Sequence, residues 1–258
     1  MSAAGLAPAG ADWPLPRWVA HRGAGKLAPE NTLAAFRLGA SFGYRAFECD
    51  VKLSADGVPF LLHDTTLART TDGRGRAGRL AWAELSRLDA GSWHGRQYAG
   101  EPMPTLAAVA AYLRANGFVL DLEIKPTPGQ EVETGRVVAR AAAALWAGAA
   151  VPPLLSSFRP ESLHAAMRAA PQLPRALLLD TLWDGCLEIA ARLDLVAIIT
   201  NHRIMDHALA EHARVQGWRT ACYTVNEPRD AERLRALGVQ TLITDAVDRF
   251  APAEAPQA

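Results

Sequence analysis

The chain has 258 residues, of which 50% are hydrophobic and 21% are charged, and its 27 basic and 27 acidic residues give a formal net charge of zero. This composition excludes global disorder and allows a large buried core. The charge balance argues against general affinity for nucleic acids or membrane surfaces, although it is compatible with a local anion site. A chain of this length suits one large domain or two small ones.

The ends of the chain and its cysteines predict a protein of a reducing compartment. The N-terminal residues lack the basic and apolar regions of a secretory signal, and no apolar run is long enough for stable membrane insertion. We therefore expect a cytoplasmic protein, with loose tails at residues 1–16 and 251–258, which are rich in Ala and Pro. Three cysteines without a CxxC pair predict neither a disulfide framework nor a cysteine zinc site.

Short apolar segments alternate with helical patterns along the whole chain. Strands are predicted at residues 18–22, 46–53, 118–124, 154–158, 175–179, 195–200, 218–225 and 239–244. Helices are predicted at residues 31–42, 105–115, 131–146, 161–169, 183–192, 206–215 and 228–237. Thr32 is expected to cap the first helix, and Pro228 suits the first turn of the last one.

An alternating series of this kind predicts a parallel sheet covered by helices. Eight units fit a closed (β/α)8 TIM barrel, whose typical size is about 250 residues, and we expect residues 17–250 to form it as a single domain. A doubly wound open sheet is the alternative fold. No GxGxxG or Walker sequence in the first strand-to-helix turn supports that alternative.

The connection between the second predicted strand and the next helix is long, spanning residues 54–104. It contains a turn signal, Ala55-Asp56-Gly57, and then an apolar run that ends in His63-Asp64. Such a connection is more often functional than idle, and in a barrel it lies at the catalytic face. Its arginines are expected on a solvated surface, with substrate attraction as a secondary role: Arg69, Arg74, Arg76 and Arg79.

Carboxylates alternate with apolar residues on two neighbouring predicted strands. Because side chains alternate between the faces of a strand, Glu48 and Asp50 point into the barrel, and so does Glu123 on the next strand. Three such oxygen donors predict a site for one divalent cation, Ca²⁺ or Mg²⁺. The alternative is an internal salt-bridge network in which Lys52 and Lys125 balance the carboxylates.

Two histidines lie at positions that the predicted barrel places near its catalytic face. His21 ends the first predicted strand and is followed by Arg22, whose guanidinium suits a phosphate. His63 follows the apolar run of the long connection and could complete an acid/base pair for phosphate-ester cleavage. Each residue alone is better explained as structural. The other five histidines are expected to be structural or surface residues: His94, His164, His202, His207 and His212.

An ordered set of motifs resembles the glycerophosphodiester phosphodiesterase family, in its short bacterial cytoplasmic form. The set begins with His21-Arg22-Gly23, Pro29-Glu30-Asn31-Thr32, Glu48-Cys49-Asp50-Val51, Asp56-Gly57, His63-Asp64 and Arg69-Thr70-Thr71-Asp72-Gly73. It continues with Pro104-Thr105-Leu106, Leu122-Glu123-Ile124-Lys125, Ser156-Ser157-Phe158, Thr224-Val225-Asn226 and Ile243-Thr244-Asp245. The resemblance extends over residues 18–250.

The resemblance implies a TIM-type barrel with an insertion after the second strand, and hydrolysis of small glycerophosphodiesters to sn-glycerol 3-phosphate and an alcohol. The metal ligands that it implies are Glu48, Asp50 and Glu123. The acid/base pair that it implies is His21 and His63. Arg22 would contact the phosphate, Lys125 would be a cation on the substrate side, and Glu30 and Asn31 would shape the site.

Tyr223 departs from the family pattern, because many relatives have tryptophan there, and this difference bears on how the glycerol or alcohol end is packed. Two other functions are weighed against the hydrolase. One is another metal-dependent barrel phosphodiesterase of the phospholipase type, which an apolar membrane-docking loop would favour. The other is a non-catalytic phosphodiester-binding protein, which loss of a catalytic histidine or carboxylate would favour. The sequence has neither feature.

Overall fold

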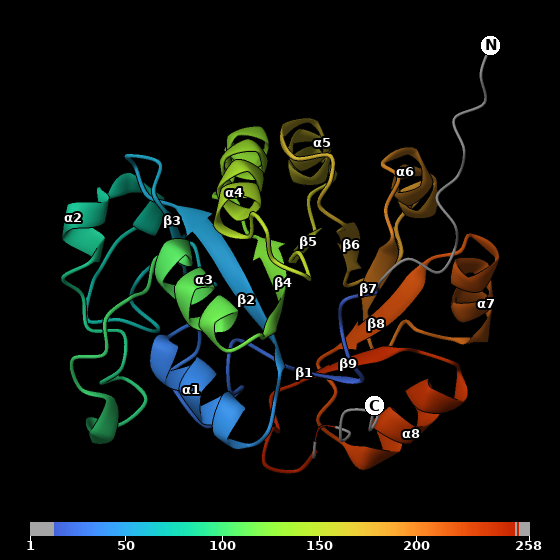
Figure 1. The fold of residues 1–258 in the computed structure, drawn as a ribbon, viewed down its shortest axis with the longest axis horizontal. Helices are drawn as coiled ribbons and strands as arrows, with labels where there is room; N and C mark the ends of the chain where they lie inside the picture. The colour runs from blue at the N-terminus through green and yellow to red at the C-terminus, as the bar shows by residue number, and fades with distance from the viewer. Residues whose placement is uncertain (1–12, 251, 253–258) are drawn as a thin grey trace.

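A computed structural model describes residues 13–250 and 252. Parallel strands form a closed ring in the middle of the molecule, and helices surround it (Figure 1). The parallel strands are β1 (Trp18–Ala20), β2 (Ala46–Leu53), β4 (Val119–Ile124), β5 (Leu154–Ser157), β6 (Arg175–Leu179), β7 (Ala197–Asn201), β8 (Arg219–Tyr223) and β9 (Thr241–Thr244). The (β/α)8 barrel expected from the alternating pattern is confirmed.

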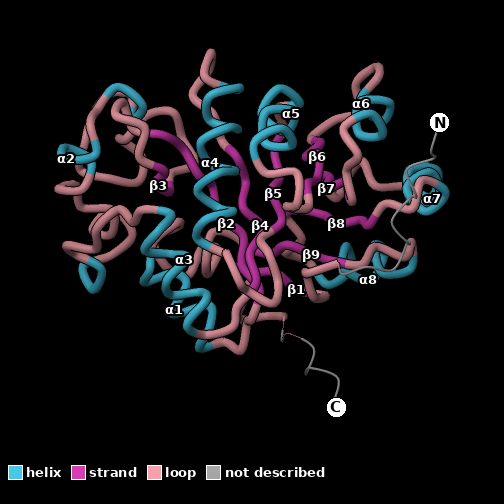
Figure 2. The backbone as a smooth tube through the Cα atoms, turned by 45° about the horizontal axis from the view of Figure 1, so that its top comes forward, coloured by secondary structure: helices cyan, strands magenta, loops and turns pink. Residues whose placement is uncertain are grey.

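The surrounding helices are α1 (Leu33–Ser41), α3 (Leu106–Ala115), α4 (Glu131–Leu145), α5 (Pro160–Ala169), α6 (Cys186–Arg192), α7 (His207–Val215) and α8 (Pro228–Ala236). Thr32 caps α1 by accepting a hydrogen bond from the amide of Ala35 at 3.2 Å, and Pro228 opens α8. Figure 2 shows these helices outside the strands. No described helix is long and apolar enough to span a membrane.

The ring closes where the first strand meets the last. β1 pairs in parallel with β9, with Val19 opposite Ile243, and pairs with β2 on its other side. Trp13 and Leu15 belong to the predicted N-terminal tail but pack against the barrel, since Leu15 is buried and the Trp13 indole donates to Thr241 at 2.9 Å. The rest of both predicted tails lies outside the described residues, apart from positions 14, 16 and 252.

The expected alternation on β2 and β4 is confirmed. Phe47, Cys49 and Val51 belong to the core between the strands and α1, α3 and α4. All three cysteines are free and buried. Inside the barrel, apolar side chains such as Ala46, Leu178 and Ile243 form the floor. Carboxylates lie above this floor on the inward face of β2, so the polar site is confined to one end of the barrel.

The long connection after β2 forms structure of its own. It contains a strand that is not among the predicted ones, β3 (Pro59–Leu61), which pairs antiparallel with β2. Its other elements are η1 (Ala77–Arg79), α2 (Trp82–Leu85) and η2 (Arg96–Tyr98). Buried side chains including Phe60, Leu67 and Leu85 give it a small separate core. The hairpin of β2 and β3 carries the chain back to the barrel mouth, where His63 follows β3.

Candidate active site

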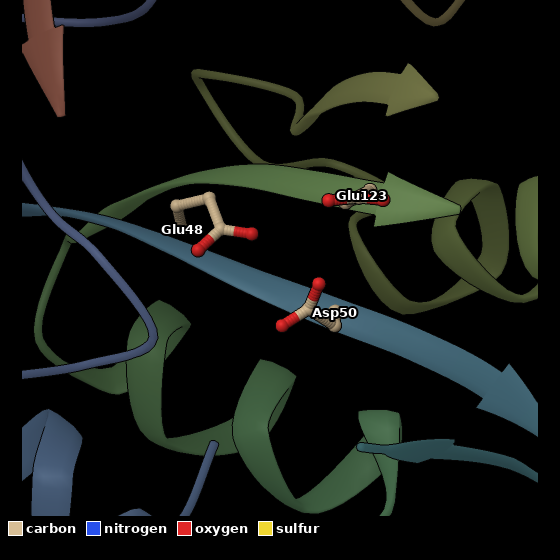
Figure 3. Close-up of side chains that lie close together, drawn as sticks. All are labelled: Glu48, Asp50 and Glu123. Carbon is tan, nitrogen blue, oxygen red and sulfur yellow. The ribbon is translucent and has the colours of Figure 1, made fainter. Parts of the chain in front are cut away.

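Three carboxylates converge on the inward side of β2 and β4. Asp50 lies opposite Glu123 in the register of these strands, and oxygens of Glu48, Asp50 and Glu123 lie within 4.8 Å of one another. Figure 3 shows the three side chains close together beside β2 and β4. All three are buried. The position that the sequence analysis predicts for each carboxylate therefore agrees with the structure.

Burial and mutual repulsion set the ionisation of these carboxylates. Burial, and then the neighbouring Asp50, raise the pKa of Glu48 well above its usual value and that of Glu123 to about 8. Burial would also raise the pKa of Asp50, but the charges of Arg22 and Lys125 outweigh burial and hold that pKa below its usual value. A divalent cation would keep the whole set ionised. Buried oxygen donors so close together fit a hard cation.

Two cations lie against the carboxylates. Arg22 contacts Asp50 through Nε at 3.2 Å, and its backbone amide donates to Glu48 at 3.1 Å. The ammonium of Lys125 lies 2.8 Å from Glu123 and 3.3 Å from Asp50. The salt-bridge alternative is therefore present for Lys125. Lys52 differs, because none of the described carboxylates lies within 4.0 Å of its ammonium.

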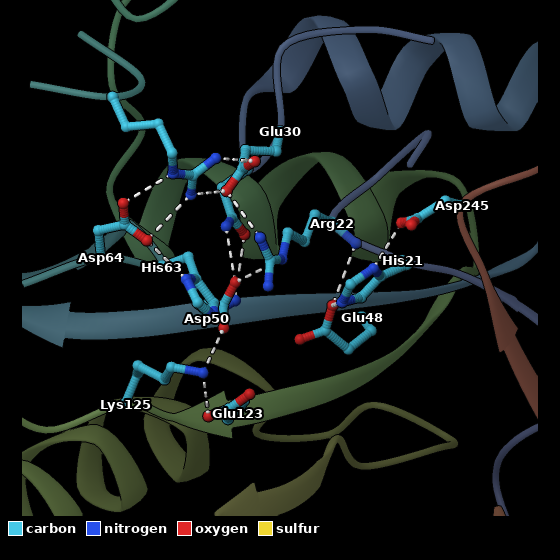
Figure 4. A network of polar contacts seen from close by, with 12 residues as sticks. His21, Arg22, Glu30, Glu48, Asp50, His63, Asp64, Glu123, Lys125 and Asp245 are labelled. Atoms are coloured by element: carbon cyan, nitrogen blue, oxygen red, sulfur yellow. Dashed lines mark hydrogen bonds and ion pairs between the residues drawn. The ribbon is translucent and has the colours of Figure 1, made fainter. Parts of the chain in front are cut away.

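Each of the two predicted histidines is backed by a carboxylate. Nδ1 of His21 lies 2.6 Å from Asp245, which follows β9, and Nδ1 of His63 lies 2.8 Å from Asp64. An ionised carboxylate accepts a hydrogen bond from Nδ1–H, so Nε2 of each ring is the nitrogen available for chemistry. Figure 4 shows the two rings approaching the carboxylates from opposite sides. Burial in particular lowers the pKa of His63.

Glu30 and Asn31 hold the other residues in place. The Asn31 amide donates to Asp50 Oδ2 at 2.8 Å, and its oxygen accepts from the Asp50 amide at 3.1 Å. Glu30 accepts from Arg22 at 2.9 Å and from Arg69 at 2.7 and 2.8 Å. Together, the two residues therefore contact Asp50 and the two arginines from the segment before α1.

Arg69 is a residue whose role the sequence analysis missed. Its side chain is partly exposed, as expected for a surface arginine, but it also binds Asp64 through Nε at 2.7 Å and Glu30 through its terminal nitrogens. It thus joins Asp64, the partner of His63, to Glu30, the partner of Arg22. Asp245 was missed in the same way. Both residues belong to motifs that carry the family resemblance, and membership in these motifs is the sequence feature that could have identified them.

Gly23 and Gly25 form a tight turn after His21 and Arg22, with φ values of +99° and +57°. A Cβ at Gly25 would lie 2.1 Å from the Asp245 carbonyl oxygen, and one at Gly23 would meet Ala35 at 2.7 Å. The glycines therefore leave room for protein backbone and helix α1. Close approach at Gly25 keeps Asp245 beside the segment that carries His21.

The converging residues line a pocket of about 200 Å³ at the barrel mouth. Its walls include the two histidines, Arg22, Glu48, Glu123 and Lys125. Its far side is formed by Phe158, Leu178, Asp180 and Tyr223. The rings of Tyr223 and Phe158 pack edge to face with centroids 5.9 Å apart. In the described part of the chain, the five histidines predicted to be structural do not line this pocket.

Known proteins share this sequence pattern and fold. The glycerophosphoryl diester phosphodiesterase family model matches residues 21–249. The glycerophosphodiester phosphodiesterase of Caldanaerobacter subterraneus subsp. tengcongensis is 31% identical over 231 residues, which are 88% of this chain and 93% of that protein.

Solved structures of phosphodiesterases have the same fold as this chain. An Oleispira antarctica phosphodiesterase in complex with the product sn-glycerol-3-phosphate is 33% identical, with a TM-score of 0.83 over 90% of this chain and 93% of that one. A glycerophosphodiester phosphodiesterase from Agrobacterium tumefaciens is 28% identical, with a TM-score of 0.75 over 92% and 99% of the two chains. The match over residues 21–249, on a barrel whose mouth gathers these residues, shows that this chain belongs to the glycerophosphoryl diester phosphodiesterase family.

Proposed function

We propose that this enzyme hydrolyses glycerophosphodiesters to sn-glycerol 3-phosphate and an alcohol. The observation that carries the proposal is the pair of carboxylate-backed histidines on opposite sides of the Glu48, Asp50 and Glu123 cluster. Phosphodiester cleavage needs one group to take a proton and another to give one, beside charges that stabilise the phosphate. Family membership, and the product bound to the Oleispira antarctica relative, support the same reaction.

The phosphate would bind between Arg22 and Lys125. Both side chains border the pocket, and both approach the carboxylate cluster. A divalent cation, Ca²⁺ or Mg²⁺, held by Glu48, Asp50 and Glu123 would supply Lewis-acid polarisation of the phosphate. Arg22 offers a planar fork of donors, and its φ of +51° fixes the backbone in a conformation that is rare for arginine.

His63 is the proposed base, and His21 the proposed acid. The lowered pKa of His63 favours the neutral ring, which can accept a proton at Nε2. A protonated His21 would have a carboxylate near each nitrogen, with Asp245 at 2.6 Å and Glu48 at 3.7 Å. The nucleophile is either water or the neighbouring glycerol hydroxyl, which would form a cyclic phosphate first. Either one gives up its proton to the base, while the acid protonates the leaving alcohol.

The glycerol end of the substrate would bind against the apolar part of the pocket lining. Phe158, Leu178 and Tyr223 offer apolar surface for carbon atoms, and the Asp180 carboxylate offers an acceptor for hydroxyl groups. The hydroxyl of Tyr223 is buried without a hydrogen-bond partner in the described structure. Such an atom is satisfied when a ligand hydroxyl binds it. Tyr223 therefore can recognise glycerol through a group that tryptophan would not place there.

The proposed function predicts release of sn-glycerol 3-phosphate from glycerophosphocholine, glycerophosphoethanolamine and glycerophosphoglycerol. Purified protein with Mg²⁺ or Ca²⁺ would be assayed with a glycerol-3-phosphate dehydrogenase coupled reaction. Release of glycerol and an alcohol phosphate instead would contradict the proposed bond specificity. Hydrolysis of intact phospholipid vesicles alone would favour a phospholipase-like enzyme, and tight binding without turnover would favour a non-catalytic protein.

Replacement of Arg69 by glutamine is expected to lower kcat by about 10- to 100-fold, because His63 and Arg22 both lose orientation. Arg69 binds Asp64 and Glu30, so one substitution loosens the residues that hold the base and the phosphate-binding arginine. Steady-state kinetics on glycerophosphocholine would measure the effect. Arg74→Gln, in the same insertion and also exposed, is the matched control. Equal kcat values for both variants would contradict a positioning role.

A further inference from the structure

A second cavity opens beside the pocket and shares a wall with it. This groove, of about 580 Å³, is bordered like the pocket by His63, Glu123, Lys125 and Phe158. Its remaining lining comes from the ends of β2, β4 and β5, residues 64–66 of the insertion, the loop between β4 and α4, the first residue of α4 and the residue before α5. A phosphate bound at the shared wall would place one ester substituent in the pocket and the other in the groove. Since the smaller pocket suits glycerol, the alcohol would extend into the groove.

The groove is bordered by a buried ammonium that lacks a carboxylate partner. Lys52 is 2% exposed, and its ammonium donates to the Lys125 carbonyl oxygen at 3.2 Å. No described carboxylate oxygen lies within 4.0 Å of it. An ammonium has three donors, and buried charges are normally paired. Oxygen atoms of a ligand in the groove would satisfy the donors that remain.

The rest of the lining mixes donors and acceptors. Arg159 brings a half-exposed guanidinium, and Glu131 Oε1 lies 3.6 Å from it. Thr65 and Thr66 add hydroxyl groups. A polyol matches this lining, because each of its hydroxyl groups both donates and accepts. A hydroxyl can accept from Arg159 or Lys52 and donate to Glu131.

The same groove is poorly suited to a quaternary ammonium. Such cations are recognised by the open faces of aromatic rings. Phe158 is the aromatic residue of the groove lining, and the Lys125 ammonium already lies 5.3 Å from its ring centroid. The lining carboxylates already have cationic partners: Asp64 has Arg69, Glu123 has Lys125, and Glu131 has Arg159. Lys52, Lys125 and Arg159 would therefore repel a further positive charge.

We propose that the groove bordered by Lys52, Glu131 and Arg159 binds the alcohol portion of the substrate and selects polyols over quaternary-ammonium alcohols. The inference rests on the proposed function, because it assigns the leaving side of the same reaction. It makes Lys52 and Arg159 specificity-determining residues. Neither one is needed for the proton transfers themselves.

The test compares kcat/KM for glycerophosphoinositol and glycerophosphocholine. Wild-type enzyme is expected to prefer glycerophosphoinositol by about 10-fold or more, as expected for hydrogen bonds to charged groups. Arg159→Ala and Lys52→Met should each lower kcat/KM for glycerophosphoinositol about 5- to 20-fold, while kcat/KM for glycerophosphocholine stays within about twofold. Arg136→Ala, on α4 and outside the groove, is the control. Arg159 is exposed, so that variant should fold even if Lys52→Met does not.

An unchanged substrate ratio in Arg159→Ala, or equal losses on both substrates in both variants, would overturn the groove assignment and leave the proposed function intact. A wild-type preference for glycerophosphocholine would overturn it as well. Absence of sn-glycerol 3-phosphate release from either substrate by the metal-loaded wild type would remove the proposed function, and the groove assignment with it.

Discussion

His21→Ala and His63→Ala are each expected to lower kcat by about 10²- to 10⁴-fold, the range for losing a general acid or base. Each substitution removes the imidazole nitrogen that faces the phosphate and leaves its carboxylate partner, Asp245 or Asp64, in place. KM should change much less, because Arg22 and Lys125 still bind the phosphate. The double variant should be little worse than either single one, since both residues serve the same step.

The pH dependence of kcat/KM distinguishes the two roles. If His63 is the base, its loss should remove the limb that rises with pH, while loss of His21 should remove the falling limb. His164→Ala is the control, because His164 is exposed on α5. Near wild-type kcat in either variant would disprove the acid/base assignment. If loss of His63 removed the falling limb and loss of His21 the rising one, His21 would be the base and His63 the acid.

Removal of divalent cations is expected to lower kcat by about 100-fold or more, because metal-polarised phosphate contributes several kcal/mol to such reactions. Chelation, dialysis and assay before and after addition of Mg²⁺ or Ca²⁺ would measure the loss and its recovery. Glu123→Gln should behave like the chelated protein, and the added cation should not restore it. Full activity in protein shown by elemental analysis to be metal-free would remove Glu48, Asp50 and Glu123 from the ligand role.

The cation should also stabilise the fold, and more strongly at higher pH. The pKa of Glu123 is raised to about 8 by burial and by Asp50, so between its usual value and about 8 the folded metal-free protein binds more protons than the unfolded chain. Stability of the metal-free protein therefore falls as pH rises through this range. A bound cation removes the penalty. The increase in Tm on adding cation should be larger at about pH 8 than at about pH 5, and an equal increase at both would contradict this account.

The barrel and its carboxylates were predictable because both depend on local periodicity. Alternation along residues 46–53 places Glu48 and Asp50 on the inner face, and parallel pairing of adjacent strands then brings Glu123 opposite Asp50. The alternation of predicted strands and helices is interrupted at residues 54–104, and this interruption indicated the insertion. These inferences need no knowledge of distant contacts, and the structure agrees with each.

The missed features depend on contacts that periodicity does not encode. Asp245 is 224 positions from His21, and Arg69 is 39 positions from Glu30, so neither pairing can be deduced from the spacing of residues along one element. β3 was missed for a related reason. Three residues are too few to show a period, and their pairing with β2 depends on the turn that precedes them.

The contact between His21 and Asp245 joins the residues that follow the first and the last strand of the barrel. The carboxylates of β2 and β4 can assemble once about half of the chain exists, but the partner of His21 follows the last strand, which pairs with the first. During synthesis, the proposed acid therefore stays without its partner until β9 has left the ribosome. Full activity is therefore expected only when the first strand and the segment that follows the last strand have come together.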